Sequence, residues 1–162
     1  MKADVNGLNE DVVRLLIAKK MTISAAESCT GGLFAALITD VPGASDVLNE
    51  SFVTYANSAK MKYLDVKADT LKEHGAVSRE TAYEMALGLQ KRTGADVTVG
   101  ITGIAGPGGG TAEKPVGLVY AGIYIGGEVE VLEMRHDGTR ERVREKTCRE
   151  VFNHIKSRIS VR

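Results

Sequence analysis

The order of helical and strand patterns along the chain predicts an α/β protein, a three-layer α/β/α sandwich with a mixed, mainly parallel β-sheet. Up to about residue 101, segments with helical spacing alternate with short β-rich segments, as in parallel strands joined by crossover helices. Two longer β-rich segments then flank Gly126-Gly127, which is typical of a hairpin turn and adds an antiparallel pair. The 162 residues suit one domain, and no repeat or linker divides residues 1–162.

Each helix and strand is predicted from a local pattern of residues. A first helix is expected over about residues 8–19, where apolar residues recur at helical spacing from Leu8 to Leu16. The other predicted elements follow in this order: a strand at 22–26, a helix ending near 39, a loop at 40–45, a strand at 51–55, a short helix from 57 to 64, a short helix closed at 75, a helix from 78 to 94, strands at 97–101, 116–125 and 128–134, and a final helix from 139.

Capping residues mark several helix ends. Helix starts are predicted at Asn57, Ser78 and Thr139, because short polar side chains accept hydrogen bonds from the free amides of a first turn. Helix ends are predicted at Gly75 and Gly94, because glycine readily takes the left-handed conformation that closes many helices.

Charge and hydropathy exclude several classes of function. Lys and Arg number 21, and Asp and Glu also number 21, so the chain lacks the positive charge expected of a nucleic-acid binder. Its apolar runs are too short to span a bilayer, which predicts no membrane partner. The first residues contain no apolar signal core, so we expect a cytoplasmic protein.

The cysteines and histidines show no metal or disulfide pattern. Cys29 and Cys148 are the only cysteines, and without a secretory signal they are expected to be reduced thiols. His74, His136 and His154 have no metal-ligand spacing with one another or with the cysteines. The sequence therefore predicts no metal site.

The stretch Ala26–Gly32, "AESCTGG", lies at a predicted strand-to-helix junction. Ser28 could be a nucleophile there, because the free amides of the helix start, in the turn from residue 29 to 32, could hold an oxyanion. Gly31 and Gly32 would leave space for a substrate. The alternative is that Ser28 or Thr30 is an N-cap, and this motif alone favours the cap.

Two neighbours of Ser28 leave alternatives open. Cys29 could be the nucleophile, since a helix N-terminus lowers the pKa of a thiol. We favour a packing role, because no histidine is placed to activate it. Glu27 could hold Lys60 or a ligand hydroxyl, or it could cap nearby backbone.

A serine nucleophile needs a base, and Lys60 in "FVTYANSAK" is a candidate at the same edge of the sheet. A lysine acts as a base only where burial or nearby positive charge lowers its pKa. The Tyr55 hydroxyl could relay a proton or orient the lysine. Spacing alone favours an ordinary surface lysine and a half-buried aromatic residue.

Two further segments suit an anionic ligand. The loop from Thr102 to Gly110 has five glycines in residues 103–110, so its amides could approach a phosphate or ribose; a flexible hairpin loop is the equal alternative. Arg140 and Arg144 share a face in the first turns of the last helix, where positive charge opposes the helix dipole. Glutamates alternate with them, so this pattern alone favours an ordinary charged face.

Taken in order, "AESCTGG", "FVTYANSAK", "HGAVS", "GITGIAGPGGG", "EKPVGLVY" and "GTRERVRE" resemble the C-terminal domain of the competence-damage-inducible protein family, CinA. The resemblance covers about residues 8–158. It implies a nicotinamide-nucleotide amidase, which hydrolyses nicotinamide mononucleotide to nicotinate mononucleotide and ammonia with a serine and a lysine, and with no metal or cofactor.

The resemblance also assigns site residues. It implies catalytic roles for Ser28, Lys60 and Tyr55. The substrate-binding residues that it implies, together with those argued above, are Glu27, Cys29, Thr30, Gly31, Gly32, Asn57, Thr102, Gly103, Ala105, Gly106, Arg140 and Arg144. Two alternative functions are a nucleotide-binding or regulatory module without catalysis and an amidase for another small carboxamide. We expect a homo-oligomer.

Overall fold

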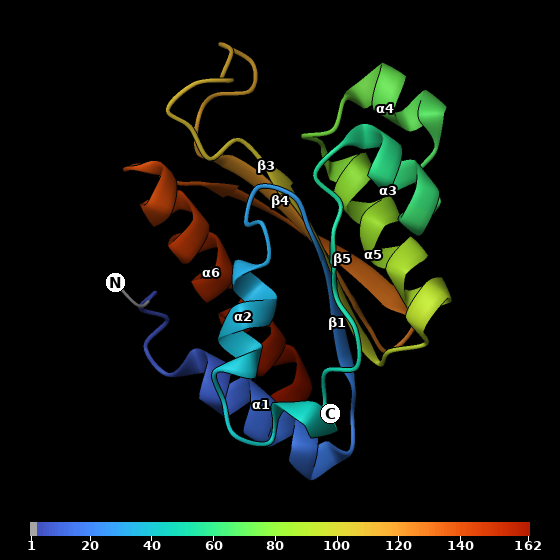
Figure 1. Cartoon of the computed structure of the whole chain (residues 1–162), viewed down its shortest axis with the longest axis vertical. Helices are drawn as coiled ribbons and strands as arrows, with labels where there is room; N and C mark the ends of the chain where they lie inside the picture. Colours follow the sequence, from blue (N-terminus) through green and yellow to red (C-terminus); the bar gives the residue numbers. More distant parts are fainter. Residues whose placement is uncertain (1–2) are drawn as a thin grey trace.

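The computed structural model describes residues 3–162, and a five-stranded sheet forms its middle layer (Figure 1). The strands are β1 (Ile23–Glu27), β2 (Phe52–Val53), β3 (Val97–Gly103), β4 (Leu118–Ile125) and β5 (Glu128–Arg135), in the order β2-β1-β3-β4-β5. β1 pairs in parallel with β2 and β3, whereas β4 is antiparallel to both β3 and β5. All strands except β4 therefore run in one direction, and the mixed, mainly parallel sheet is confirmed.

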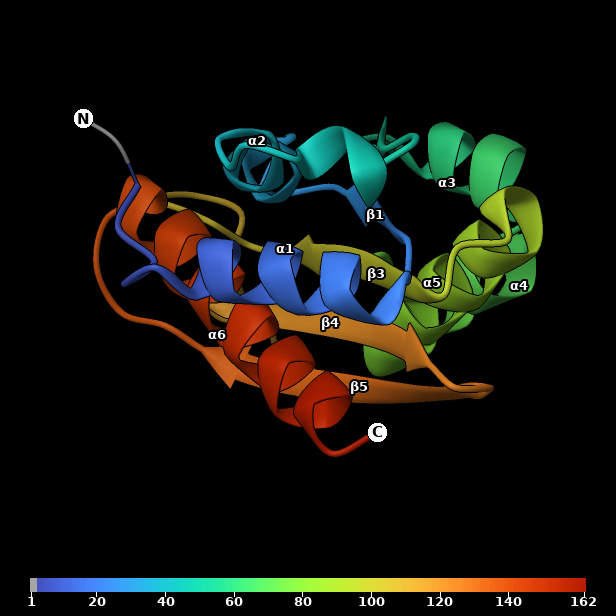
Figure 2. The same cartoon turned by 90° about the horizontal axis from the view of Figure 1, so that it is seen from below.

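Helices cover both faces of this sheet, which gives the predicted three layers (Figures 1 and 2). One layer holds α1 (Leu8–Lys19), α2 (Leu33–Thr39) and α6 (Arg140–Ser160), and the other holds α3 (Asn57–Leu64), α4 (Ala68–His74) and α5 (Arg79–Thr93). A short 3₁₀ helix, η1 (Ala44–Asp46), follows α2. Within residues 3–162, no helix has the length and apolar character needed to cross a membrane.

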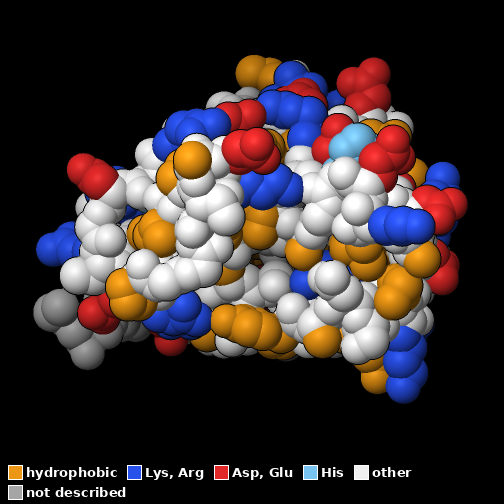
Figure 3. Space-filling model, turned by 90° about the horizontal axis from the view of Figure 1, so that it is seen from above, with side chains coloured by type: hydrophobic (Ala, Val, Ile, Leu, Met, Phe, Trp, Pro, Cys, Tyr) orange, Lys and Arg blue, Asp and Glu red, His pale blue; other side chains and the backbone are white. Residues whose placement is uncertain are grey.

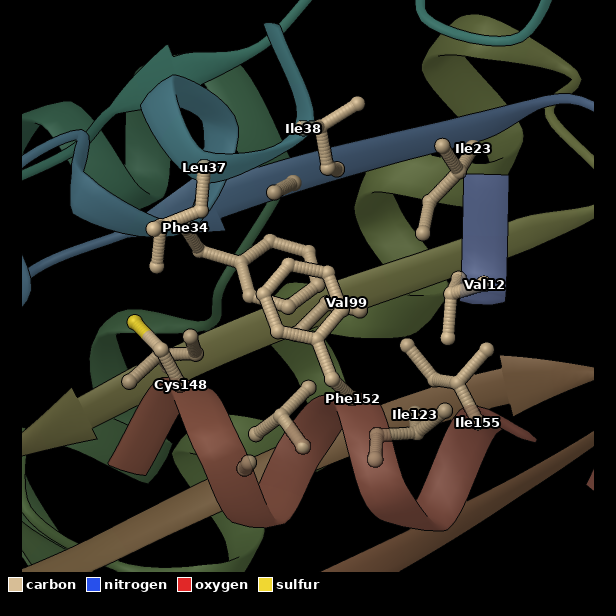
Figure 4. Packing of buried hydrophobic residues seen from close by; sticks show 14 of the residues in the cluster. Val12, Ile23, Phe34, Leu37, Ile38, Val99, Ile123, Cys148, Phe152 and Ile155 are labelled. Atoms are coloured by element: carbon tan, nitrogen blue, oxygen red, sulfur yellow. The ribbon is translucent and has the colours of Figure 1, made fainter. Parts of the chain in front are cut away.

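The main hydrophobic core lies between the sheet and the layer of α1, α2 and α6 (Figure 4). Its centre is a stacked pair, Phe34 of α2 and Phe152 of α6, with ring centroids 4.3 Å apart and both residues fully buried. Such aromatic pairs add about 0.5–1.5 kcal/mol beyond the burial of their area. This pair holds α2, the helix that follows Ser28, onto α6, which carries Arg140.

A smaller core lies on the opposite face, where α5 packs directly on the middle of the sheet. The closest approach is at Gly100 of β3 and its cross-strand partner Gly122 of β4. A Cβ on Gly122 would lie only 2.2 Å from the Ala82 carbonyl oxygen of α5. Glycine at this position therefore lets the helix backbone rest against the sheet.

Most helix boundaries agree with the capping signals, and a few predictions are wrong. Ser78 and Thr139 cap α5 and α6 through their side chains, as predicted. Asn57 is not an N-cap, because it is the first residue of α3 and Ala56 precedes the helix without a side-chain cap. Neither Ser28 nor Thr30 caps α2, whose N-cap position is Gly32.

Strand boundaries also differ in ways that affect the site. The strand predicted over residues 51–55 pairs only at Phe52–Val53, and the following backbone turns towards α3. β3 continues to Gly103, so Thr102 and Gly103 belong to the strand and not to the glycine loop. β4 begins at Leu118, two residues later than predicted.

Candidate active site

A cavity of about 290 Å³ lies at the carboxyl ends of β1 and β3. Figure 3 shows this end of the molecule, hollowed near its middle. Five segments meet there: the turn after β1, the segment from β2 into α3, the residues before α5, the end of β3 with its loop, and the first residue of α6. The lining residues are Ser28, Cys29, Tyr55, Lys60, Ala76, Val77, Thr102, Gly103, Ile104, Ala105, Gly106, Gly108, Gly109 and Arg140.

Ser28 and Lys60 meet in this cavity. Lys60 Nζ lies 3.3 Å from Ser28 Oγ, although the residues are 32 positions apart in the sequence. Lys60 is 1% exposed and Ser28 is 8% exposed. Lys60 Nζ also donates to the carbonyl oxygens of Thr54, at 2.9 Å, and Tyr55, at 3.2 Å. The turn after β2 thus aims the amine at the serine.

Burial lowers the pKa of the Lys60 amine. No carboxylate within residues 3–162 forms an ion pair with it to oppose this effect. A neutral amine has two N–H bonds and one lone pair. In the neutral form, the carbonyls of Thr54 and Tyr55 can accept hydrogen bonds from the two N–H groups, which would leave the lone pair for Ser28 Oγ, as a general base requires.

Cys29 is buried at 6% exposed, and its thiol is a poor nucleophile. Burial raises its pKa from 9.0 to about 11, so the thiol stays protonated at neutral pH. This agrees with the packing role favoured from the sequence. Cys29 and Cys148 are both free cysteines.

The Tyr55 hydroxyl does not contact Lys60, although the Tyr55 side chain lines the cavity and is 58% exposed. The contact between the two residues is made by the Tyr55 backbone carbonyl. The hydroxyl instead accepts a hydrogen bond of 3.0 Å from Arg140 Nη2. The structure therefore ties the phenol to the arginine and not to the lysine.

Glu27 is fully buried and does not line the cavity. Its carboxylate accepts hydrogen bonds from the amides of Gly32 at 3.2 Å, Phe34 at 3.0 Å and Ala35 at 2.9 Å. Of the alternatives left open by the sequence, Glu27 therefore caps backbone and holds neither Lys60 nor a ligand. A carboxylate at this helix start is also favoured by the helix dipole.

The turn after Ser28 has few amides free for an oxyanion. The Gly31 amide donates to the Ser28 carbonyl at 3.0 Å, and the Gly32 amide donates to Glu27. Within residues 3–162 the amides of Cys29 and Thr30 donate to no other residue, although the Cys29 amide lies near its own thiol, so the four donors expected from the sequence reduce to two. Gly31 and Gly32 have φ of 56° and 98°, so their role here is to make the sharp turn.

Arg140 and Arg144 serve different contacts, although they are one helical turn apart. Arg140 lines the cavity and also donates to the Gly106 carbonyl at 2.9 Å, so it joins the glycine loop to Tyr55 within one chain. Arg144 lies outside the cavity and donates to the Thr30 carbonyl at 2.7 Å. Among the lining residues the charged side chains are Lys60 and Arg140, with no carboxylate.

Several predicted binding residues are outside the cavity, and others were missed. Cys29, Thr102, Gly103, Ala105, Gly106 and Arg140 line it, whereas Glu27, Thr30, Gly31, Gly32, Asn57 and Arg144 do not. The lining residues that were not named individually as binding residues are Ala76 and Val77, and also Ile104, Gly108 and Gly109, which lie in the loop proposed for an anionic ligand. All five belong to sequence motifs that were recognised, "HGAVS" and the glycine loop, but nothing in those motifs says which residues face inward.

A larger cavity of about 630 Å³ lies between α5 and the edge strand β5. Charged and apolar side chains line it, among them Arg79, Tyr83 and Val131, and no serine, cysteine or histidine does. It therefore offers no counterpart of the Ser28–Lys60 pair. Within residues 3–162, no cluster of three or more histidine, cysteine or carboxylate side chains could hold a metal ion.

The fold and site define an α/β protein with a buried serine–lysine pair at the carboxyl edge of its sheet. Residues 5–159 match the model of the CinA C-terminal domain, and the chain belongs to this family. The resemblance noted from the sequence motifs is thereby confirmed.

Relatives in the same family are similar in sequence and structure. A putative competence-damage inducible protein of Alkaliphilus metalliredigens is 47% identical over 152 residues, which cover 94% of this chain and 37% of that protein. A solved competence/damage inducible protein, CihA from Agrobacterium tumefaciens, is 42% identical, with a TM-score of 0.91 over 94% of each chain. A CinA superfamily protein of Klebsiella pneumoniae has a TM-score of 0.93 at 33% identity, over 98% of this chain and 99% of that one. The chain spans little more than a third of the length of the curated relatives that it matches.

Proposed function

We propose that this chain is a nicotinamide-nucleotide amidase, an amidohydrolase that converts nicotinamide mononucleotide and water to nicotinate mononucleotide and ammonia. The observation that carries the proposal is the 3.3 Å approach of the buried Lys60 amine to Ser28 Oγ. The chain belongs to the CinA family, and the resemblance to this family implies the same activity, which supports the proposal. The names of the relatives describe competence-damage inducible proteins and do not state an activity.

The first half of the reaction forms an acyl-enzyme. Neutral Lys60 takes the proton of Ser28 while Oγ attacks the carboxamide carbon and the carbonyl oxygen becomes an oxyanion. The Cys29 amide, which donates to no other residue and belongs to a residue that lines the cavity, is the candidate donor to that oxyanion; losing such a donor typically costs about 3 kcal/mol of barrier. Lys60 then returns the proton to the leaving nitrogen, the C–N bond breaks and ammonia departs.

The second half regenerates the enzyme. Lys60, neutral again, takes a proton from water, and the hydroxide oxygen attacks the ester carbon. The Ser28 ester bond breaks, and Oγ recovers the proton from Lys60. The resulting acid loses its proton to solvent, where ammonia takes up a proton to become ammonium, and nicotinate mononucleotide leaves as the carboxylate. One water is consumed per ammonia released, and no redox step or metal ion is needed.

The charge of the cavity supports an anionic substrate. Its lining contains Arg140 and no carboxylate, so a cationic pyridinium ring without a phosphate would meet only positive charge. The 5′-phosphate of nicotinamide mononucleotide would interact with Arg140, and this remote binding energy would position the carboxamide at Ser28. The volume of about 290 Å³ is near the lower end for small-molecule sites and suits a mononucleotide.

Measurement of ammonia release from nicotinamide mononucleotide tests the proposal. We expect release by the wild-type protein, no release by Ser28→Ala, and release by Cys29→Ala, which removes the adjacent thiol as a control. Binding of the nucleotide without ammonia release would show a nucleotide-binding module, and equal rates with nicotinamide riboside would show an amidase of another specificity. A cytoplasmic location and a homo-oligomeric state stay predictions.

A further inference from the structure

Glu27 has no place in the steps above, yet its buried carboxylate accepts three hydrogen bonds beside Ser28. Both carboxylate oxygens are used, by the amides of Gly32, Phe34 and Ala35. Those amides belong to the end of the Ser28 turn and to the first residues of α2. A buried carboxylate is tolerated only with such compensation, because its desolvation is costly. The turn that presents Ser28 is thus closed by its own preceding residue.

The backbone of Glu27 fixes the other half of the pair. The Glu27 carbonyl accepts a 2.9 Å hydrogen bond from the Thr54 amide. The Thr54 carbonyl in turn accepts a 2.9 Å hydrogen bond from Lys60 Nζ, which lies 3.3 Å from Ser28 Oγ. One residue therefore connects the serine turn, through its side chain, to the segment that aims the lysine, through its carbonyl.

The Glu27 carboxylate also limits which amides near Ser28 can donate a hydrogen bond to a substrate. It accepts hydrogen bonds from three amides at the α2 start and so occupies them, whereas the amide of the cavity-lining Cys29 donates to no other residue. If the carboxylate were lost, the turn could relax towards an ordinary helix start. The Ser28 hydroxyl and the Cys29 amide would then move together.

We infer that Glu27 is a positioning residue, whose carboxylate holds the turn from Ser28 to Gly32 so that the serine hydroxyl faces Lys60 and the Cys29 amide faces the reacting carbonyl. This inference rests on the proposed role of Ser28 as the nucleophile. It replaces the role in substrate binding expected from the sequence. A positioning role makes the reactivity of Ser28, and not only the stability of the fold, depend on Glu27.

The test measures Ser28 reactivity without the nucleotide. A small alkyl fluorophosphonate labels an activated serine, since Oγ forms a bond to phosphorus, fluoride leaves, and Lys60 takes the serine proton. Labelling of the full chain is followed by intact mass, with Ser28→Ala as the blank. Glu27→Gln, which keeps size but loses charge, should be labelled about tenfold to a hundredfold more slowly than wild type.

The matched control acts on the other end of the same helix. Asn9 Nδ2 donates a 2.9 Å hydrogen bond to the Leu37 carbonyl in the last turn of α2. Asn9→Ala should lower the melting temperature yet keep the wild-type labelling rate, because it leaves the Ser28 turn intact. If Glu27→Gln does not fold, Glu27→Asp, one methylene shorter, is measured in the same way and should also be slow.

The outcomes separate this inference from the proposed function. Slow labelling of the Glu27 variant with a normal Asn9 variant supports the positioning role. A wild-type rate in the Glu27 variant, or an equal slowing in the Asn9 variant, overturns it while the serine mechanism stands. Wild-type protein that is labelled no faster than Ser28→Ala overturns the nucleophile, and the role of Glu27 with it.

Discussion

Replacement of Arg140 by methionine tests how the site recognises its substrate. The guanidinium lines the cavity and donates to the Tyr55 hydroxyl and the Gly106 carbonyl. Methionine keeps the unbranched shape but removes the charge. A hydrogen bond to a charged group contributes about 1.5–3 kcal/mol, which corresponds to about 10- to 150-fold in kcat/KM. Because Arg140 is exposed in the unliganded protein, we expect a loss near the lower limit, about tenfold.

The assay compares two substrates, nicotinamide mononucleotide and nicotinamide riboside, by initial rates of ammonia release. Arg140→Met should lower kcat/KM for the phosphorylated substrate and leave the value for the riboside unchanged. The matched control is Arg144→Met, one turn along α6, whose guanidinium binds the Thr30 carbonyl outside the cavity. In the control variant, kcat/KM for the two substrates should change by the same factor.

Two results would refute this reasoning. If Arg140→Met lowers kcat/KM equally for both substrates, Arg140 acts through the structure of the loop and not through the phosphate. If Arg144→Met selectively impairs the phosphorylated substrate, the phosphate binds on the other side of the Ser28 turn. Either result would also remove the electrostatic argument for a nucleotide substrate.

Three further predictions concern the base, the thiol and the core. Burial lowers the pKa of Lys60, and only its neutral form accepts the serine proton. As the pH rises, kcat/KM should therefore increase through that pKa and reach its plateau before pH 10.5. A profile still rising at pH 10.5 contradicts this. Because burial raises the pKa of Cys29 to about 11, iodoacetamide at pH 8 should neither modify Cys29 nor lower the proposed ammonia release, as intact mass and the rate of ammonia release would show. Phe152→Ala should cost about 3–5 kcal/mol in urea unfolding, because it empties a fully buried site stacked on Phe34, while KM at low temperature stays at its wild-type value.

Sequence patterns were sufficient to predict the layers and most boundaries, because helical and strand periodicities and caps are local signals. Ser78 and Thr139 show this, since each cap bonds to an amide three residues away. The prediction of a strand as far as Tyr55 was wrong for a long-range reason. The segment is β-rich, but beyond Val53 its carbonyls are taken by Lys60 and not by a neighbouring strand.

Alternatives near Ser28 were decided by contacts that spacing does not encode. Lys60 has the pattern of a surface lysine and is 1% exposed, because α3 folds its amine under the turn after β1. Arg140 and Arg144 share a face by helical periodicity, yet four residues also advance the helix by about 6 Å. That advance places one arginine in the cavity and the other on the Thr30 carbonyl.

By itself, the sequence determined the α/β class, the order of elements, the family and the residue types available for chemistry, because these depend on local periodicity and on motifs. Only the tertiary structure decided which of those residues lie together. Burial lowers the pKa of Lys60 and raises that of Cys29. The Glu27 carboxylate, also buried, accepts a hydrogen bond from the Phe34 amide at the start of α2. Desolvation and hydrogen-bond partners arise when distant segments pack, so the alternatives that the sequence left open for "AESCTGG" could be decided only in the folded chain.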